Sequence, residues 1–336
     1  MHSKPKQFPF YTGLPSAPRA TEPALLSVLE RKRERDVSAY LADAGLTAAV
    51  NVALLLSQPL LLTGEPGTGK TQLAYSLGRE LGYEVLKFET KSTSTARDLF
   101  YYYDTLRRFH DVQLEQQAKS TDYISYNALG TAIIRSNPKH IHEKCLNPSF
   151  EHWGPVQSIV LIDEIDKAPR DFPNDLLNEV EDMYFKVPEL GIGDYKVTAN
   201  SDLPPIIIIT SNSEKGLPNA FLRRCIFYNI PFPTAERLSD IVLSHLNVSD
   251  TVKPRWFDDA LDFFRGLREP ANNLEKRPAT AELLNWFNCL TELSGDARLQ
   301  DREETLSSSL SALCKTVSDQ ERAIDILKDW LSKRPR

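Results

Sequence analysis

The chain has 336 residues, of which 41% are hydrophobic and 26% are charged, and its formal net charge is −6. This amount of apolar material can form a sizeable core, and the length favours two domains. A net negative charge gives no overall attraction for a polyanion, so the composition disfavours a nucleic-acid partner. The four cysteines form no CxxC pair, and we expect reduced structural thiols rather than a disulfide framework or a zinc site.

The first part of the chain carries no targeting or membrane signal. Residues 1–25 are repeatedly broken by proline and lack the apolar core of a signal peptide, so they predict an extended arm. The longest apolar stretch, ALLLSQPLLL, is much shorter than a membrane span. We therefore expect a cytoplasmic protein with no membrane segment.

Two patterns of apolar residues follow the arm. Short apolar runs separated by helical patterns predict buried parallel strands of an α/β sheet, at residues 60–63, 84–88, 158–163, 205–210 and 226–231. After Pro231 and Pro233, apolar residues recur only at helical intervals of three and four. The sequence thus predicts an α/β domain over residues 26–232 and an all-helical domain over residues 233–336.

The motif GEPGTGKT at residues 64–71 is a complete phosphate-binding loop between a predicted strand and a predicted helix. Its glycines, Gly64, Gly67 and Gly69, allow successive backbone N–H groups to converge on phosphate oxygens, and Thr68 lies among them. Lys70 is expected to neutralise the β- and γ-phosphates, and the Thr71 hydroxyl to bind magnesium. The motif therefore predicts a site for ATP and Mg²⁺.

A second motif, SIVLIDE, is a buried strand that ends in two carboxylates. Such strand ends face the ligand crevice of an open α/β sheet. Asp163 is expected on the magnesium side, and Glu164 is expected to polarise the attacking water. The alternative is a solvated acidic turn in which Lys167 pairs with Asp166; the complete phosphate-binding loop favours the catalytic interpretation.

With these two motifs the chain resembles AAA+ ATPases and, among them, the MoxR family, over residues 38–330. The segment LIDEIDKAPRDFPNDLLNEVEDMYFKVPELG is similar to the family's strand-end acids, following helix and hairpin, and TSNSEKGLPNAFLRRC to its sensor and arginine-finger region. The resemblance implies an AAA+ P-loop NTPase fold: a five-stranded parallel αβα core with strand order 5-1-4-3-2, followed by an all-helical lid.

The resemblance also implies roles for further polar residues. Asn212 matches the sensor that orients water between Glu164 and the γ-phosphate, since an amide both donates and accepts. Arg224 matches the finger that completes a neighbouring subunit's site, with Arg223 as the alternative. In the lid, Arg277 matches the arginine that contacts the γ-phosphate, with Lys276 as the alternative.

Two further matches are to aromatic positions. Tyr40 and Leu41 match the place where the family covers the adenine base. The run Phe100, Tyr101, Tyr102 and Tyr103 follows a family motif, and four adjacent aromatic residues on one helix cannot all face a core. At least one of them is therefore expected at the surface or at an interface between subunits.

The resemblance implies a MoxR-like ATPase that couples magnesium-dependent ATP hydrolysis in a ring, typically a hexamer, to remodelling of a partner protein. Its adaptor would be a separate protein, typically one with a von Willebrand A domain. Two alternatives remain open: a nucleic-acid motor built on the same core, and a slowly hydrolysing ATP-dependent switch or scaffold. Glu164 and Asn212 favour competent hydrolysis over the switch.

Overall fold

A computed structural model describes residues 40–114, 119–137, 139, 155–190, 196–214, 216–294, 299–301 and 303–334. The predicted arm over residues 1–25 and Cys145 lie outside these residues. The described residues form two compact units. One comprises residues 42–65 and 70–230, and we call it the sheet unit. The other, the helical unit, comprises the described residues from 231 onward together with residues 40–41 and 66–69.

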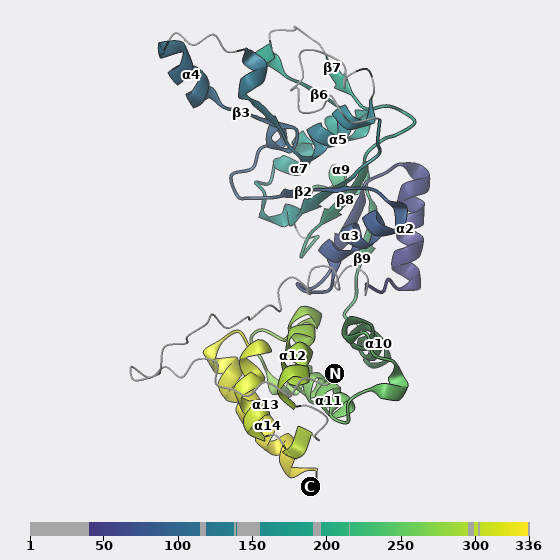
Figure 1. Cartoon of the computed structure of the whole chain (residues 1–336), viewed down its shortest axis with the longest axis vertical. Coiled ribbons are helices and arrows are strands. Elements are labelled where there is room, and N and C mark those ends of the chain that lie inside the picture. Colours follow the sequence, from purple (N-terminus) through teal and green to yellow (C-terminus); the bar gives the residue numbers. More distant parts are fainter. Residues whose placement is uncertain are drawn as a thin grey trace, which may run out of the picture. The chain divides into compact units, whose positions relative to one another are not determined.

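The sheet unit is built on a five-stranded parallel sheet (Figure 1). Its strands are β1 (Leu60–Thr63), β2 (Val85–Glu89), β5 (Ile159–Asp163), β8 (Ile206–Thr210) and β9 (Ile226–Asn229). In space they follow the order β2-β5-β8-β1-β9. Counted along the chain, this is the predicted order 5-1-4-3-2, so the predicted AAA+ P-loop fold is confirmed. The central strands β1 and β5 are buried along their whole length, as their unbroken apolar runs require.

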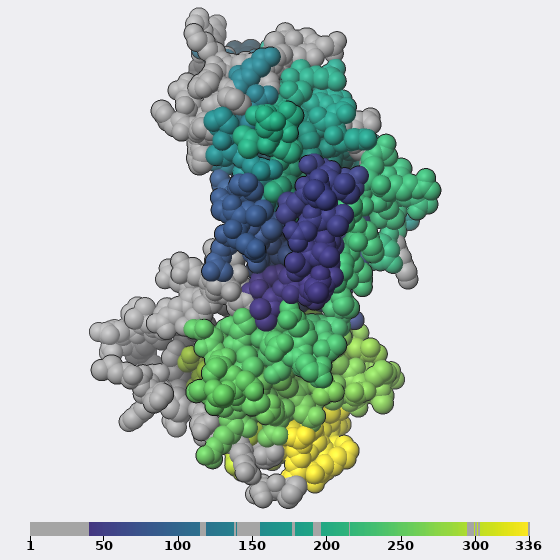
Figure 2. Space-filling model, turned by 90° about the vertical axis from the view of Figure 1, so that its right-hand side faces the viewer, coloured from purple at the N-terminus to yellow at the C-terminus, as the bar shows by residue number. Residues whose placement is uncertain are grey.

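Helices cover both faces of this sheet because alternate strand residues point to opposite sides. On one side lie α2 (Ala44–Leu56) and α3 (Lys70–Leu81). The other side packs against α5 (Ala128–Ser136), α7 (Phe172–Asp175), α8 (Leu177–Asp182) and α9 (Asn219–Leu222). In the space-filling view α2, in purple, lies at the surface of its unit, where its last residues Leu55 and Leu56 are exposed (Figure 2).

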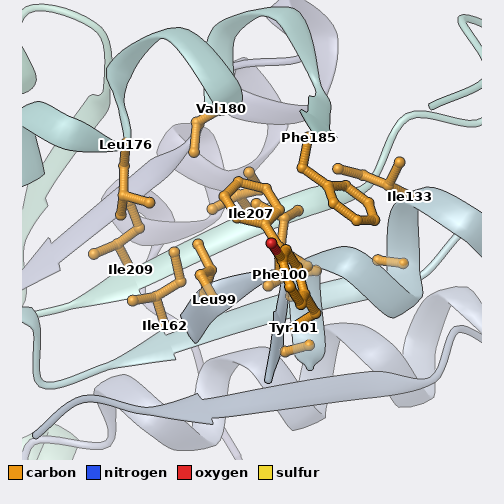
Figure 3. Close-up of a cluster of buried hydrophobic side chains, with 14 of the residues drawn as sticks. Leu99, Phe100, Tyr101, Ile133, Ile162, Leu176, Val180, Phe185, Ile207 and Ile209 are labelled. Carbon is orange, nitrogen blue, oxygen red and sulfur yellow. The ribbon is translucent and has the colours of Figure 1, made fainter. Parts of the chain in front are cut away.

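The second face holds the larger core of the sheet unit (Figure 3). The ring of Phe185 stacks on Phe100 at a centroid distance of 5.3 Å and lies 6.2 Å from the ring of Tyr101. Three residues of the aromatic run form a strand, β3 (Tyr101–Tyr103), and Phe100 is the C-cap of the short 3₁₀ helix Ala96–Leu99 before it. Alternation along the strand leaves Tyr102 54% exposed. One residue of the run is therefore at the surface, as predicted, although on a different element.

Two small antiparallel sheets extend from this unit. Strand β3 pairs with β4 (Ile124–Tyr126), and β6 (Tyr184–Lys186) pairs with β7 (Lys196–Thr198). Helix α4 (Thr105–Gln113) follows β3 and lies at one end of the sheet unit in Figure 1. The β6–β7 pair follows the acidic strand end in the chain, where the resemblance implies a hairpin.

The helical unit, green to yellow in Figure 1, packs around an aromatic core. Its helices are α10 (Ala235–Leu246), α11 (Phe257–Arg268), α12 (Thr280–Ser294), α13 (Glu303–Ser309) and α14 (Val317–Ser332). Trp256, Trp286, Phe263 and Phe287 are fully buried there and contact one another through their rings. Within the described residues, none of the helices combines the length and the apolar character that crossing a bilayer requires.

Candidate nucleotide-binding site

The loop from Gly64 to Gly69 joins β1 to the first residue of α3. Its backbone takes positive φ angles at Gly64, Gly67 and Gly69, of 142°, 76° and 90°. Residues with a Cβ rarely adopt these angles, so the glycines are required by the backbone path. The loop thus has the conformation that directs N–H groups toward an anion at a helix N-terminus.

Lys70 is the first residue of α3 and is buried. Its Nζ donates to the carbonyl oxygens of Gly64 and Glu65, at 2.8 and 3.0 Å, and to Oδ1 of Asn212, at 3.1 Å. All three donors of the ammonium group are therefore used within the loop and the end of β8. Burial lowers the pKa of Lys70 below its usual value, against the opposing effect of the nearby carboxylates.

Asp163 at the end of β5 collects hydroxyl groups from two neighbouring elements. Its Oδ1 accepts from Oγ1 of Thr71 at 2.8 Å and from Oγ1 of Thr210 at 2.7 Å. Thr210 is brought there by the parallel register of β5 and β8, which pairs Ile162 with Ile209. The sheet thus places the strand-end acid directly against the hydroxyl group that follows Lys70.

The other oxygen of Asp163 faces a cation. Nζ of Lys87, on β2, lies 2.9 Å from Oδ2 of Asp163 and 3.3 Å from Oε1 of Glu89. Burial alone would raise the pKa of Asp163, but the hydrogen bonds from Thr210, Lys87 and Thr71 outweigh it and lower the pKa below its usual range. Asp163 is therefore ionised at neutral pH.

Glu164 has a left-handed backbone, with φ 58° and ψ 53°. Residues other than glycine adopt this conformation at an energetic cost, and such residues are enriched at functional sites. The backbone N–H of Glu164 donates to Oγ1 of Thr210 at 2.9 Å. Thr210 thus contacts both strand-end residues, as a donor to Asp163 and as an acceptor for Glu164. The side chain of Glu164 pairs with Lys167. The acidic-turn alternative had instead paired Lys167 with Asp166.

Asn212, just beyond β8, is held by Asp166. Oδ1 of Asp166 accepts from the backbone N–H of Asn212 at 3.1 Å, and Oδ2 lies 3.4 Å from the Asn212 amide nitrogen. This arrangement directs Oδ1 of Asn212 to Lys70, at 3.1 Å. Asp166, Asn212 and Lys70 therefore form one chain of hydrogen bonds from the acidic turn to the glycine loop.

Four side chains of this cluster were absent from the sequence-based site. Thr210 and Asp166 position predicted residues, while Lys87 and Lys167 pair with the two strand-end acids. No sequence motif could have predicted the contact between Lys87 and Asp163, because the two residues lie on different strands. The threonine of TSN could have been found from the strand order, because β8 was expected beside β5.

Tyr40 and Leu41, which match the place where the family covers adenine, belong to the helical unit, as do residues 66–69 of the loop. The ring of Tyr40 lies against Gly69, because a Cβ added to this glycine would come within 3.0 Å of the ring. Leu41 is 38% exposed. Gly69 therefore serves two purposes, a positive φ and the close approach of an aromatic ring.

The predicted arginines are exposed residues on separate elements. Nε of Arg224 lies 2.8 Å from Oε2 of Glu181, and its Nη1 donates to the carbonyl oxygen of Ala220 at 3.3 Å. Arg223 is the exposed C-cap of α9. Arg277 and Lys276 are exposed in the segment that leads into α12. The position of Arg277 relative to Lys70 and Asp163 is therefore a prediction of the resemblance alone.

The side chains around Asp163 suit a hard divalent cation. Thr71 Oγ1 and Asp163 Oδ1 are oxygen ligands that already lie 2.8 Å apart, and the carboxylate is held in its charged form. The described residues contain no group of three or more histidine, cysteine, aspartate or glutamate side chains that could hold a metal ion by themselves. A magnesium ion brought by a nucleotide fits this set of donors.

Comparison with known proteins agrees with this geometry. Residues 59–225 match the family described as the AAA domain of the dynein-related subfamily. Lon protease 1 of Bacillus subtilis is 26% identical over 219 residues, a region that covers 65% of this chain and 23% of Lon. The chain thus spans about a quarter of that relative's length.

Solved structures of two variants of Thermotoga maritima RuvB are also similar, at 16% and 15% identity with TM-scores of 0.44 and 0.41. Each similarity covers 84% of this chain and 69% or 68% of the RuvB chain. The assignment rests instead on the family match, which begins one residue before β1 and includes both motifs. The match to this family thus covers residues 59–225, and together with the strand order it supports an AAA+ P-loop ATPase.

Proposed function

We propose that the protein couples magnesium-dependent ATP hydrolysis, within a ring of identical subunits, to remodelling of a partner protein, as its resemblance to the MoxR family implies. The observation that carries the hydrolytic part is the convergence of Lys70, Thr71, Asp163, Glu164 and Asn212 at the ends of β1, β5 and β8. Ligands of open α/β sheets bind at this edge.

The first task of these residues is to bind the nucleotide. Lys70 exchanges the carbonyl oxygens of Gly64 and Glu65 for phosphate oxygens, which are stronger acceptors for an ammonium group. Thr71 and Asp163 hold magnesium, which neutralises the charge that develops on the transferred phosphoryl group. Tyr40, on Gly69, covers the adenine side together with Leu41.

The second task is to activate water. Glu164 is the general base, and its left-handed backbone marks the turn at which β5 ends. Lys167 pairs with Glu164 here, and this ion pair must loosen before the carboxylate accepts a proton. Asn212, oriented by Asp166, completes the set, because its amide can hydrogen-bond both water and phosphate.

The proposed assembly gives a role to Arg224. Its hydrogen bonds go to Glu181 and Ala220 on its own unit, and its side chain is 44% exposed. We therefore assign Arg224 as the finger that enters a neighbouring subunit's site, with Arg277 as the lid arginine. A planar cation suits charge on a transferring phosphoryl group, and a finger supplied in trans makes hydrolysis depend on the ring.

The hydrolytic proposal can be tested by comparing Lys70→Ala with Glu164→Gln. The first variant removes the cation that binds phosphate, so ATP binding should be lost, whereas the second should bind ATP and stop turning over. Calorimetry measures the first property and phosphate release the second. Lys91→Ala, the removal of an exposed lysine just beyond β2, is the matched control and should leave both properties unchanged.

Excess chelator should abolish turnover, and magnesium or manganese should restore it. Equal loss of ATP affinity in the Lys70 and Glu164 variants would show that the strand-end acids are misassigned. Full turnover in chelator would contradict the metal site.

A further inference from the structure

Lys87 is a charged residue at the site that the steps above do not use. It lies in the middle of β2, on the strand that pairs with β5, and its side chain is 32% exposed. Its ammonium group lies 2.9 Å from Oδ2 of Asp163. A cation is thus in contact with the carboxylate that is expected to receive another cation.

The two oxygens of Asp163 have different partners. Oδ1 accepts two hydroxyl hydrogen bonds, from Thr71 and Thr210, at 2.8 and 2.7 Å. Oδ2 is paired with the ammonium group of Lys87. Because the Asp163 side chain is only 8% exposed, water compensates little of its charge, and the two hydroxyl hydrogen bonds and the ion pair with Lys87 compensate it instead.

Glu89 offers the ammonium group of Lys87 a second carboxylate partner. It is two residues along β2, on the same side of the strand, and its Oε1 lies 3.3 Å from the same ammonium group. Glu89 is 66% exposed, so a lysine that moves from Asp163 toward Glu89 also moves toward water. The ammonium group can therefore leave Oδ2 without losing a carboxylate partner.

We propose that Lys87 is a positioning residue that holds Oδ2 of Asp163 in the nucleotide-free site and competes with magnesium for this carboxylate, thereby setting the magnesium concentration that ATP binding requires. The inference rests on the proposed Mg–ATP site. A divalent ion at Asp163 and an ammonium group in contact with the same carboxylate repel each other, and partial burial limits the screening of this repulsion. Tight metal binding therefore requires Lys87 to move toward Glu89.

The test is the affinity for a fluorescent, non-hydrolysable ATP analogue, measured over a range of free Mg²⁺ concentrations. Lys87→Met keeps the length of the side chain and removes its charge. It should lower the Mg²⁺ concentration at half-maximal affinity by roughly tenfold, a discounted electrostatic effect for a pair near the surface. Glu89→Gln removes the second acceptor and should raise that concentration, whereas Lys87→Arg should remain close to the wild type.

Thermal unfolding provides a readout that does not depend on activity. In chelator, Lys87→Met should melt below the wild type, because Asp163 loses its counter-charge. With Mg²⁺ and the analogue its melting temperature should rise by more than that of the wild type, because the ion no longer competes with lysine. A purely structural ion pair would instead lower both melting temperatures equally. Lys328→Met, which removes an exposed lysine of α14, controls for net charge.

The outcomes separate this inference from the proposed function. Wild-type protein that binds the analogue equally well at every Mg²⁺ concentration would contradict the metal site itself. A wild-type response to Mg²⁺ that is unchanged, or shifted to higher concentration, in Lys87→Met would overturn the role of Lys87 alone. If Lys87→Met does not fold, Glu89→Gln decides the question, and an unchanged midpoint there would overturn the proposal.

Discussion

Two buried carboxylates, Asp163 in the sheet unit and Asp319 in the helical unit, are held in different ways. The partners of Asp163 are side chains, those of Thr71, Thr210 and Lys87. Asp319, fully buried on α14, accepts from the backbone N–H groups of Glu275 and Lys276 at 2.8 and 3.0 Å. The pKa of each is below its usual range, because these hydrogen bonds outweigh the effect of burial.

The difference indicates what each carboxylate can do. Side-chain hydroxyl and ammonium groups can rotate away, so Asp163 can exchange partners for a bound ion. Backbone N–H groups cannot rotate away without moving the chain, so Asp319 fixes the segment that leads to Arg277 and α12. We therefore expect loss of Asp163 to affect mainly activity and loss of Asp319 to affect mainly stability.

The largest expected effect is that of Asp163→Asn on ATP turnover. The amide keeps the shape of the carboxylate but removes the charge that is proposed to hold magnesium, so the rate should fall by roughly 100-fold or more. Steady-state phosphate release measures it. Near-normal turnover, with magnesium still required, would show that Asp163 is not needed for activity and would contradict the proposed difference between the two acids.

Asp319→Asn should leave the sheet unit folded and destabilise the helical unit by about 2–3 kcal/mol, because one of two buried backbone N–H groups would face an amide NH₂. Three of the four tryptophans, Trp256, Trp286 and Trp330, lie in the helical unit, so denaturant unfolding followed by tryptophan fluorescence reports on it. An unchanged unfolding midpoint would show that these hydrogen bonds do not hold the segment.

Wild-type protein and Asp319→Asn should also differ in how their stability depends on pH in the acid range. The pKa of Asp319 is lowered from its ordinary value of 3.8, so its contribution is fully present above that value and is lost as the pH falls through the lower folded-state pKa. Wild-type stability in the helical unit should therefore fall more steeply below this value than that of Asp319→Asn. Parallel curves, measured by fluorescence at a series of pH values, would contradict the assignment.

Thr210→Val should have a smaller effect, confined to catalysis. It removes the hydroxyl that contacts both Asp163 and the backbone of Glu164, and should reduce turnover by about tenfold at nearly constant ATP affinity. Thr63→Val is the matched control, since Thr63 is a buried strand-end threonine whose hydroxyl bonds Asn229 at 3.1 Å, away from both acids. Equal loss of turnover in the two variants would show that Thr210→Val acts through general destabilisation and not through the two acids.

The sequence predicted the parts of the site that depend on local pattern. The glycine loop, Lys70 and the strand-end acids are contiguous motifs, and the strand order came from the family resemblance. Lys87, Asp166 and Thr210 act across strands, and their contacts depend on the register of β2, β5 and β8. The prediction of a helix for the aromatic run was wrong, because pairing with β4 makes Tyr101–Tyr103 a strand. The roles of Arg224 and Arg277 depend on subunits and domains that local pattern does not describe.

We propose that hydrolysis belongs to an assembly in which Arg224 completes a neighbour's site. The most direct measurement is the specific ATPase rate as a function of protein concentration, recorded together with light scattering. We expect a rate that rises steeply as oligomers form, and an Arg224→Ala variant that binds ATP but remains inactive at every concentration. Dilute monomer that hydrolyses ATP at the same specific rate as concentrated protein would contradict it.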